Sequence, residues 1–121
     1  MVGIDVVHVS RIENVCDMSA FIDKYFSVRE KKYVFDKNER TRVQTVAGLF
    51  AAKEAVLKAF KIGLGRGIAL KDIEILHDES GSPYLDITVD VSQLLEKSGH
   101  TGADISISHD GDYAVAVCQL F

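Results

Sequence analysis

The sequence has little proline and little cysteine: among 121 residues there are one proline, two cysteines and nine glycines. This scarcity argues against a proline-rich or glycine-rich linker and against a low-complexity tract. Cys16 and Cys118 do not have the spacing of a C-x-x-C motif or of a zinc site. We therefore interpret both as free thiols and expect a reducing, cytoplasmic environment.

Long apolar runs are also missing. No segment approaches the roughly 18 apolar residues of a membrane span, and residues 1–10 lack the basic flank and cleavage site of a signal peptide. A formal net charge of -4 argues against a general nucleic-acid binder but leaves room for a local basic patch that binds an anion. We expect one domain, residues 1–121, that binds neither nucleic acid nor membrane.

The hydrophobic pattern predicts an α+β fold, with a largely antiparallel sheet packed on one long helix. That helix is predicted over residues 41–62, with Gly63 as its natural C-cap. Ser10 with Glu13, and Ser27 with Glu30, have the spacing of a capping box and are expected to begin two shorter helices. The remaining predictions are strands over 2–9, 72–77, 83–89, 103–109 and 112–120, and helices over 10–16, 19–26, 28–37 and 91–99.

Lys53 occupies an unusual position in the long helix. At about 100° per residue it falls near the middle of an apolar arc that includes Leu49, Phe50 and Leu57. Lysine is rarely buried without a partner, so the sequence demands a reason for a cation on this face. Glu54 follows it directly, at the edge of the same arc.

Two carboxylates stand where burial is expected. Asp5 interrupts the apolar run Val2–Val7, and Glu54 lies on the long helix predicted to pack against the sheet. Each has an ordinary explanation: Asp5 could bond a backbone amide at the strand edge, and Glu54 could pair with Lys58 four residues later. If they meet, two carboxylates without a histidine or cysteine cluster suit Mg²⁺, which takes its other ligands from water and phosphates.

A basic, glycine-rich segment follows the long helix. Lys58, Lys61 and Arg66 could surround a phosphate, and the loop from Gly63 to Gly67 offers backbone amides. The loop lacks the spacing of a P-loop and follows a helix instead of preceding one, so on its own it is most simply a helix C-cap. His109 ends the ISISH strand at a turn and is by itself an ordinary turn histidine, because no nucleophile motif accompanies it.

Taken together in chain order, these motifs resemble one family. Gly3-Ile4-Asp5, Phe50-Ala51-Ala52-Lys53-Glu54-Ala55, Gly63-x-Gly65 and Ser106-Ile107-Ser108-His109 are similar to the motifs of the small holo-acyl-carrier-protein synthases. These are single-domain 4'-phosphopantetheinyl transferases, and the resemblance covers essentially the whole chain. It implies that the phosphopantetheine arm of coenzyme A moves to a serine of acyl carrier protein in fatty acid biosynthesis, leaving adenosine 3',5'-bisphosphate.

The resemblance also implies roles for individual residues. Asp5 and Glu54 match the Mg²⁺ ligands, and Lys53 matches the lysine beside them, which we expect to pair with Asp5, Glu54 or a phosphate. Lys58, Gly63 and Gly65 match positions that contact coenzyme A, and His109 lies in the same cleft. Of the groups that could accept the serine proton, we consider an ordered water, Glu54 and Glu30.

The resemblance implies a homotrimer whose active sites lie between subunits. Arg11 matches a basic position where the acidic carrier protein docks, and Lys24 and Arg29 follow closely enough in sequence to extend that surface. Many members have a basic residue where this chain has Leu49, so Arg42 is a candidate to supply the missing phosphate contact. Two alternatives stay open: a Mg²⁺-dependent nucleotide pyrophosphatase, and a non-catalytic trimer that binds coenzyme A.

Overall fold

The computed structural model describes residues 1–15, 17–62 and 68–121. In chain order the elements are β1 (Val2–His8), α1 (Val9–Glu13), α2 (Met18–Tyr25), α3 (Val28–Phe35), α4 (Glu39–Ala59), the 3₁₀ turn η1 (Leu70–Asp72), β2 (Ile75–His77), β3 (Pro83–Leu85), α5 (Val89–Ser98), β4 (Ala103–Asp110) and β5 (Tyr113–Leu120). Within these ranges no helix is both long enough and apolar enough to cross a bilayer.

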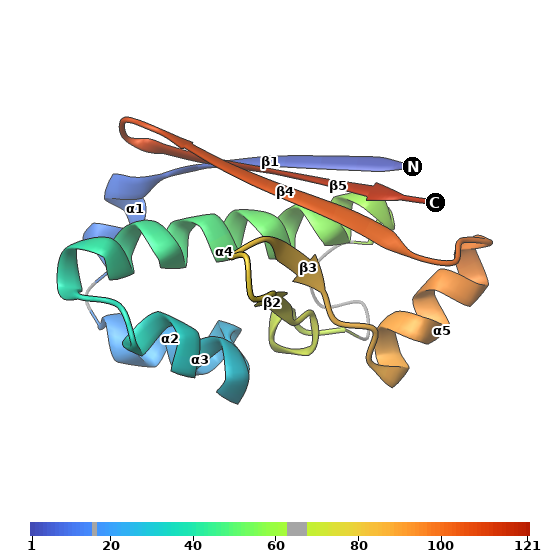
Figure 1. Ribbon diagram of the computed structural model, residues 1–121, viewed down its shortest axis with the longest axis horizontal. Coiled ribbons are helices and arrows are strands. Elements are labelled where there is room, and N and C mark those ends of the chain that lie inside the picture. Colours follow the sequence, from blue (N-terminus) through green and yellow to red (C-terminus); the bar gives the residue numbers. More distant parts are fainter. Residues whose placement is uncertain (16, 63–67) are drawn as a thin grey trace.

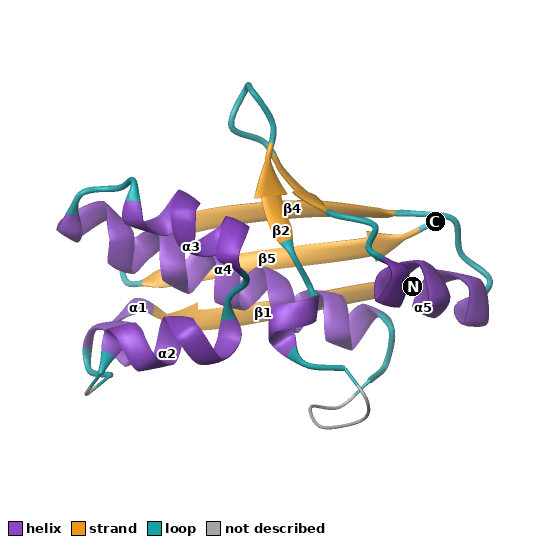
Figure 2. Cartoon of the chain, turned by 90° about the horizontal axis from the view of Figure 1, so that it is seen from below, coloured by secondary structure: helices purple, strands orange, loops and turns teal. Residues whose placement is uncertain are grey.

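The fold has α4 at its centre. Strands β1, β5 and β4 form an antiparallel sheet in that order, with β5 in the middle, and α4 packs along one face of it (Figure 1). The helices α2 and α3 and the small β2–β3 hairpin lie on the other side of α4 (Figures 1 and 2). The predicted α+β fold with an antiparallel sheet on one long helix is therefore confirmed.

The position of α4 between two layers explains its sequence. Its C-terminal two thirds is buried almost all the way round, and alanine and glycine occupy many of the positions in contact with neighbours. The sheet, in contrast, is buried on one face only, because strand residues alternate between faces. Ala114, Ala116 and Cys118 of β5 face α4 and are buried, whereas Val2, Ile4 and Val6 of β1 face away from it and are exposed.

The ends of α4 differ from the prediction at both termini. The helix begins at Glu39, because the side chain of Asn38 accepts a hydrogen bond from the Thr41 amide at 2.9 Å. It ends at Ala59, because Lys61 adopts a left-handed conformation (φ 59°) and the Ile62 amide bonds the Leu57 carbonyl at 2.9 Å. Gly63, the predicted C-cap, lies outside the described residues.

Of the two predicted capping boxes, one is confirmed and one is wrong. Ser27 and Glu30 form the reciprocal pair at the start of α3. At α1 the helix begins at Val9, and the imidazole of His8 caps it by accepting from the Ser10 amide. The strand predicted over 83–89 ends at Leu85, since Thr88 turns the chain and caps α5.

Candidate functional site

Asp5 and Lys58 form an ion pair where the edge strand β1 meets α4. Asp5 points to the α4 side of the sheet, and the Lys58 ammonium lies 2.8 Å from its Oδ1 atom and 3.2 Å from the Ile4 carbonyl. The Asp5 side chain is 16% exposed, and Lys58 is 54% exposed. The predicted carboxylate in β1 is thus half-buried beside the helix and open to solvent from one side.

Glu54 joins this pair from the preceding turn of α4. Burial, followed by the negative charge of Asp5, raises the pKa of Glu54, while the charges of Lys58 and Arg11 lower it. Glu54 therefore lies within electrostatic reach of Asp5. We call Asp5, Glu54 and Lys58 the carboxylate site.

The carboxylate site has the chemistry of a hard-cation site. It offers carboxylate oxygens, and the repulsion between Asp5 and Glu54 is what a divalent cation would relieve. Among the described residues no group of three or more histidine, cysteine, aspartate or glutamate side chains could hold a metal ion. Mg²⁺ is commonly bound through one or two carboxylates with water and phosphate oxygens in the other positions, so the residues present fit this ion.

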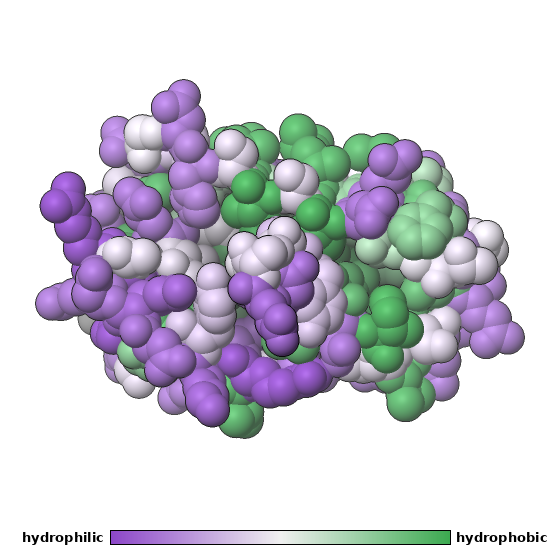
Figure 3. Space-filling view, viewed as in Figure 1, coloured by the Kyte–Doolittle hydropathy of each residue, from purple (hydrophilic) through white to green (hydrophobic). Residues whose placement is uncertain are grey.

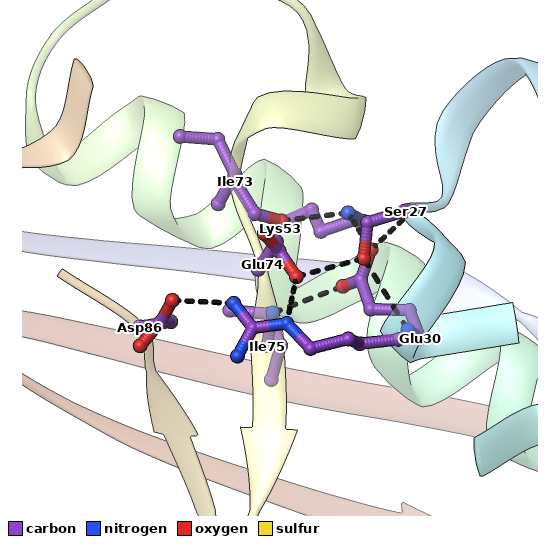
Figure 4. Close-up of polar contacts among 8 residues, drawn as sticks. Ser27, Glu30, Lys53, Ile73, Glu74, Ile75 and Asp86 are labelled. Carbon is purple, nitrogen blue, oxygen red and sulfur yellow. Dashed lines mark hydrogen bonds and ion pairs between the residues drawn. The ribbon is translucent and has the colours of Figure 1, made fainter. Parts of the chain in front are cut away.

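Lys53 does not belong to the carboxylate site, although it precedes Glu54 in sequence. Consecutive helical residues point about 100° apart, and Lys53 points away from β1 into the layer formed by α3 and the β2 segment (Figure 4). Its ammonium donates to Glu30 Oε1 at 2.5 Å and to the carbonyls of Leu70 and Ile73 at 2.8 and 2.6 Å. The predicted pairing of Lys53 with Asp5, Glu54 or a phosphate is wrong, because its three donors are already used in the core.

Glu30 is the buried partner of Lys53 and is equally enclosed. Its carboxylate also accepts from the amides of Ser27 and Ile75, each at 2.9 Å. Burial raises the pKa of Glu30 and lowers that of Lys53, and their contact opposes both effects. Both side chains are 0% exposed, so Glu30 cannot reach a substrate and is excluded as the general base.

His109 lies on the opposite edge of the sheet from Asp5. It is in β4, separated from β1 by the central strand β5. Its Nε2 atom donates to the Gln44 carbonyl at 2.9 Å, and the ring packs on Gly48, where an added Cβ would come within 3.0 Å of it. Within one chain, the structure does not bring His109 to the carboxylate site.

A cavity of about 200 Å³ opens beside His109, between α4, the β2–β3 hairpin and β4. His77 lines it, stacks on Tyr33 with a centroid distance of 4.0 Å, and has a buried Nδ1 atom without a hydrogen-bond partner among the described residues. His77 was not predicted from the sequence, where its one signal is its place at the end of a predicted strand before a turn. The residues that line the cavity are Tyr33, Thr45, Gly48, Leu49, His77, Gly81, Pro83, Ile107 and His109.

Arg42 does not replace the basic residue that Leu49 displaces. Its guanidinium donates to the carbonyls of Phe35 and Lys37 at 3.3 and 2.9 Å, at the end of α3, and lies over the Phe35 ring. Leu49 is buried in the core and reaches the His109 cavity, whereas Arg42 lines a separate groove with Met18 and Val43. The structure therefore places Arg42 away from the cavity beside His109, and a phosphate contact from Arg42 stays a prediction.

The three residues predicted to dock a partner have different surroundings. Arg11 is exposed on α1, and its charge reaches Glu54. Lys24 is exposed on α2 and lies 5.3 Å from the centre of the Tyr25 ring. Arg29 pairs with Glu74 at 3.0 Å and with Asp86 at 2.6 Å, and these two acids raise its pKa further. Because its charge is offset within the chain, Arg29 is a poor anchor for an acidic partner.

Gly63 and Gly65, predicted to contact coenzyme A, lie outside the described residues. The partner of Lys53 could have been predicted from the sequence. A lysine in an apolar arc requires a buried acid, and the capping-box position of Glu30 already fixed that carboxylate at the start of α3.

Comparisons with known proteins show the family of this chain. A family model for the 4'-phosphopantetheinyl transferase superfamily matches residues 1–118. The chain is 40% identical over 120 residues to a holo-[acyl-carrier-protein] synthase of Clostridium acetobutylicum, covering 98% of this chain and 94% of the relative. It is 36% identical over 122 residues to the same enzyme of Campylobacter hominis, covering 99% and 96%.

Solved structures of holo-[acyl-carrier-protein] synthases have the same fold. The holo-[acyl-carrier-protein] synthase of Helicobacter pylori in complex with coenzyme A has a TM-score of 0.85 and 29% identity, covering all of both chains. A Chronobacterium ammoniagenes ACPS–CoA complex has a TM-score of 0.86 and 32% identity, covering 100% of this chain and 96% of the other. The likeness extends over the whole fold, so it includes the elements that carry Asp5, Glu54 and His109.

Proposed function

This chain belongs to the 4'-phosphopantetheinyl transferase superfamily and is a holo-[acyl-carrier-protein] synthase, and from this premise we propose the reaction that it carries out. The 4'-phosphopantetheine group of coenzyme A moves to a serine hydroxyl of an apo acyl carrier protein, in fatty acid biosynthesis. A bond forms between the serine oxygen and phosphorus, the pyrophosphate bond breaks, and adenosine 3',5'-bisphosphate leaves. The coenzyme A complexes of two similar enzymes support coenzyme A as the donor.

The carboxylate site is the observation that carries this proposal. Asp5 and Glu54 would hold Mg²⁺, and their mutual repulsion supports this assignment. When bound, the ion would supply positive charge that stabilises the leaving phosphate. Two protein carboxylates leave the remaining coordination positions for water and substrate.

Lys58 supplies the second cation of the site. Its ammonium is held by Asp5 and the Ile4 carbonyl, at the rim of the protein, where it is half exposed. Lys58 would be free to bind a phosphate oxygen when Asp5 serves as a metal ligand. Lys58 then adds fixed positive charge beside the reacting phosphorus, the main requirement of phosphoryl transfer.

The serine must lose its proton as it attacks. Of the two carboxylates considered for this step, Glu30 is enclosed in the core and Glu54 lies at the carboxylate site. Glu54, directly or through an ordered water, therefore accepts the proton.

We also propose a homotrimer with active sites between subunits. The sheet face that points away from α4 exposes Val2, Ile4 and Val6 of β1, which are 61%, 54% and 52% exposed. Hydrophobic side chains gather along this upper side of the molecule (Figure 3). A face of this kind favours burial against further copies of the chain. Since His109 and the carboxylate site occupy opposite edges of the sheet, such packing offers a way to join His109 of one copy to the carboxylates of another.

The carrier protein would dock on α1. Arg11 is exposed there, and its charge already acts on Glu54, so an acidic protein bound to Arg11 would present its serine near the carboxylate site. The chain has a net charge of -4, so whole-molecule attraction cannot guide an acidic partner and a local basic group must do so.

One experiment tests the reaction against both alternatives. The purified chain is incubated with apo acyl carrier protein, coenzyme A and Mg²⁺, and the carrier protein is weighed by mass spectrometry. Transfer predicts a mass gain of one phosphopantetheine group. A pyrophosphatase would release product from coenzyme A without the carrier protein, and a non-catalytic binding trimer would release none and would bind coenzyme A equally with and without Mg²⁺.

A further inference from the structure

Strand β1 and helix α4 touch backbone to backbone at Gly3. A Cβ atom added to Gly3 would lie 2.0 Å from the Ala55 carbonyl oxygen and 2.5 Å from the Ala59 nitrogen. These two atoms are the acceptor and donor positions of one helical hydrogen bond, four residues apart. Because both belong to the backbone of a buried helix, no rotation of a side chain could relieve the overlap.

This contact borders the carboxylate site. Gly3 and Asp5 are two residues apart on β1 and so point to the same face, toward α4. On the helix, Ala55 directly follows Glu54 and Ala59 directly follows Lys58. The separation of the two backbones at Gly3 therefore fixes how far the Asp5 carboxylate stands from the Glu54 carboxylate.

We propose that Gly3 is a positioning residue that sets the spacing of Asp5 and Glu54 and so fits the site to Mg²⁺ in preference to a larger divalent cation. The inference rests on the proposed role of the two carboxylates. Mg²⁺ requires ligands at about 2.0–2.1 Å in near-ideal octahedral geometry, whereas Ca²⁺ accepts about 2.3–2.6 Å and irregular geometry. Moving β1 away from α4 penalises the smaller ion more.

Gly48 provides a matched control. It is also a buried glycine between α4 and the sheet, and a Cβ there would meet the His109 ring at 3.0 Å and the Ile107 side chain at 3.1 Å. This contact is at the β4 edge, away from Asp5 and Glu54. A change at Gly48 disturbs the same helix–sheet interface without touching the spacing of the carboxylates.

The test is calorimetric titration of the full chain with Mg²⁺ and, separately, with Ca²⁺, without substrate. In Gly3→Ala the affinity for Mg²⁺ should fall roughly tenfold or more, with a much smaller change for Ca²⁺. In Gly48→Ala the ratio of the two affinities should equal that of the unmodified chain. An unchanged ratio in Gly3→Ala, or an equal change of the ratio in both variants, overturns the proposal.

Two further variants keep the test decisive. Asp5→Glu lengthens the ligand by one methylene. As a single change it should weaken Mg²⁺ binding, and combined with Gly3→Ala it should restore binding. If Gly3→Ala does not fold, Glu54→Asp withdraws the other carboxylate and should shift the preference toward Ca²⁺. Retained Mg²⁺ preference in Glu54→Asp contradicts the spacing argument.

The outcome for Gly3 is separable from the outcome for the proposed function. If the unmodified chain modifies the carrier protein but the metal ratios do not respond to Gly3→Ala, the positioning role is wrong and the transferase assignment stands. If the unmodified chain binds Mg²⁺ with the expected response to Gly3→Ala but transfers nothing, the positioning role stands and the reaction is wrong.

Discussion

Lys53 and Glu30 form an ion pair of 2.5 Å in which neither side chain is exposed to solvent. The lysine ammonium has three donors and uses them on Glu30 and two carbonyls, while the glutamate also accepts two backbone amides. This pair ties α4 to the start of α3 and to the segment that leads into β2. The lysine in the apolar arc of α4 is thus a structural residue, next in sequence to a site residue.

Breaking this pair should be costly. Lys53→Met leaves a buried carboxylate without its cation, and we expect the free energy of unfolding to fall by about 3–5 kcal/mol. Urea denaturation measures it, with Lys97→Met on the exposed face of α5 as the control, which should change stability by less than about 0.5 kcal/mol. The double variant Lys53→Met/Glu30→Gln should lose less than the sum of the single changes. Simple additivity would contradict the pairing.

Stability should decrease in mild acid because of His77. Burial, and secondarily the charge of Lys37, lower the pKa of His77 below its ordinary value of 6.5. The unfolded chain then binds more protons than the folded chain as the pH falls through about 6.5, so stability rises with pH in that window. At pH values well above 6.5 His77 is neutral in both the folded and the unfolded chain, so its titration no longer changes the stability.

His77→Phe keeps a ring to stack on Tyr33 and removes the titration. Urea denaturation at pH 7.5 and pH 5.5 should show a smaller loss of stability in this variant than in the unmodified chain, with a difference of at most about 1.4 kcal/mol per pH unit. Equal losses would show that His77 is protonated as easily in the folded chain as in the unfolded one.

The fold was largely predictable from the sequence, because its main features rest on periodicity and local chemistry. Strand alternation and the Ser27–Glu30 capping box are local signals, and both are present. The helix ends were less predictable, since a left-handed Lys61 ends α4 before the glycine that the sequence offers. The Ser10–Glu13 signal did not specify the cap of α1, because His8 takes that place.

The candidate site was predictable only in part. Asp5 and Glu54 stood out because each is a charged residue in an apolar pattern. The same pattern at Lys53 has another cause, and periodicity cannot tell a lysine that faces a cleft from one paired in the core. Arg29 shows the same limit: its partners Glu74 and Asp86 are 45 and 57 residues away along the chain. Only the tertiary structure shows that its charge is offset.

Assembly through the outer face of the sheet makes a clear prediction. Val2→Glu places a charge on the exposed apolar face and should convert a trimer into monomers with little transferase activity. Val89→Glu, on an equally exposed position of α5, should leave the assembly unchanged. Sedimentation measures both. A fully active monomer would contradict the proposal.

Composite sites can be tested by complementation. Asp5→Ala and His109→Ala should each be inactive alone, because each lacks one half of every site. Coexpressed, they should form mixed trimers in which some interfaces carry an intact Asp5 and an intact His109, so activity should return in part. Mixed trimers without activity would show that both residues are required in the same copy.

Docking of the carrier protein should depend on Arg11. Arg11→Glu should raise the apparent KM for the carrier protein at low salt, and the penalty should shrink as ionic strength screens the exposed charge. Coenzyme A binding should change little. Lys97→Glu is the matched control, since it makes the same charge reversal at an exposed position of α5. An unaltered KM in Arg11→Glu at low salt would place the docking surface elsewhere.

The central claim is that Asp5 and Glu54 hold the Mg²⁺ ion that phosphopantetheine transfer requires. The most direct measurement is the mass of apo acyl carrier protein after incubation with coenzyme A, millimolar Mg²⁺ and either Asp5→Ala or Glu54→Ala, with Glu96→Ala on α5 as the control. Neither Asp5 nor Glu54 belongs to the hydrophobic core, and Glu96 is exposed. All three variants should therefore melt near the temperature of the unmodified chain. The account predicts a full mass gain with Glu96→Ala and none with the other two; near-normal turnover by Asp5→Ala or Glu54→Ala would contradict it.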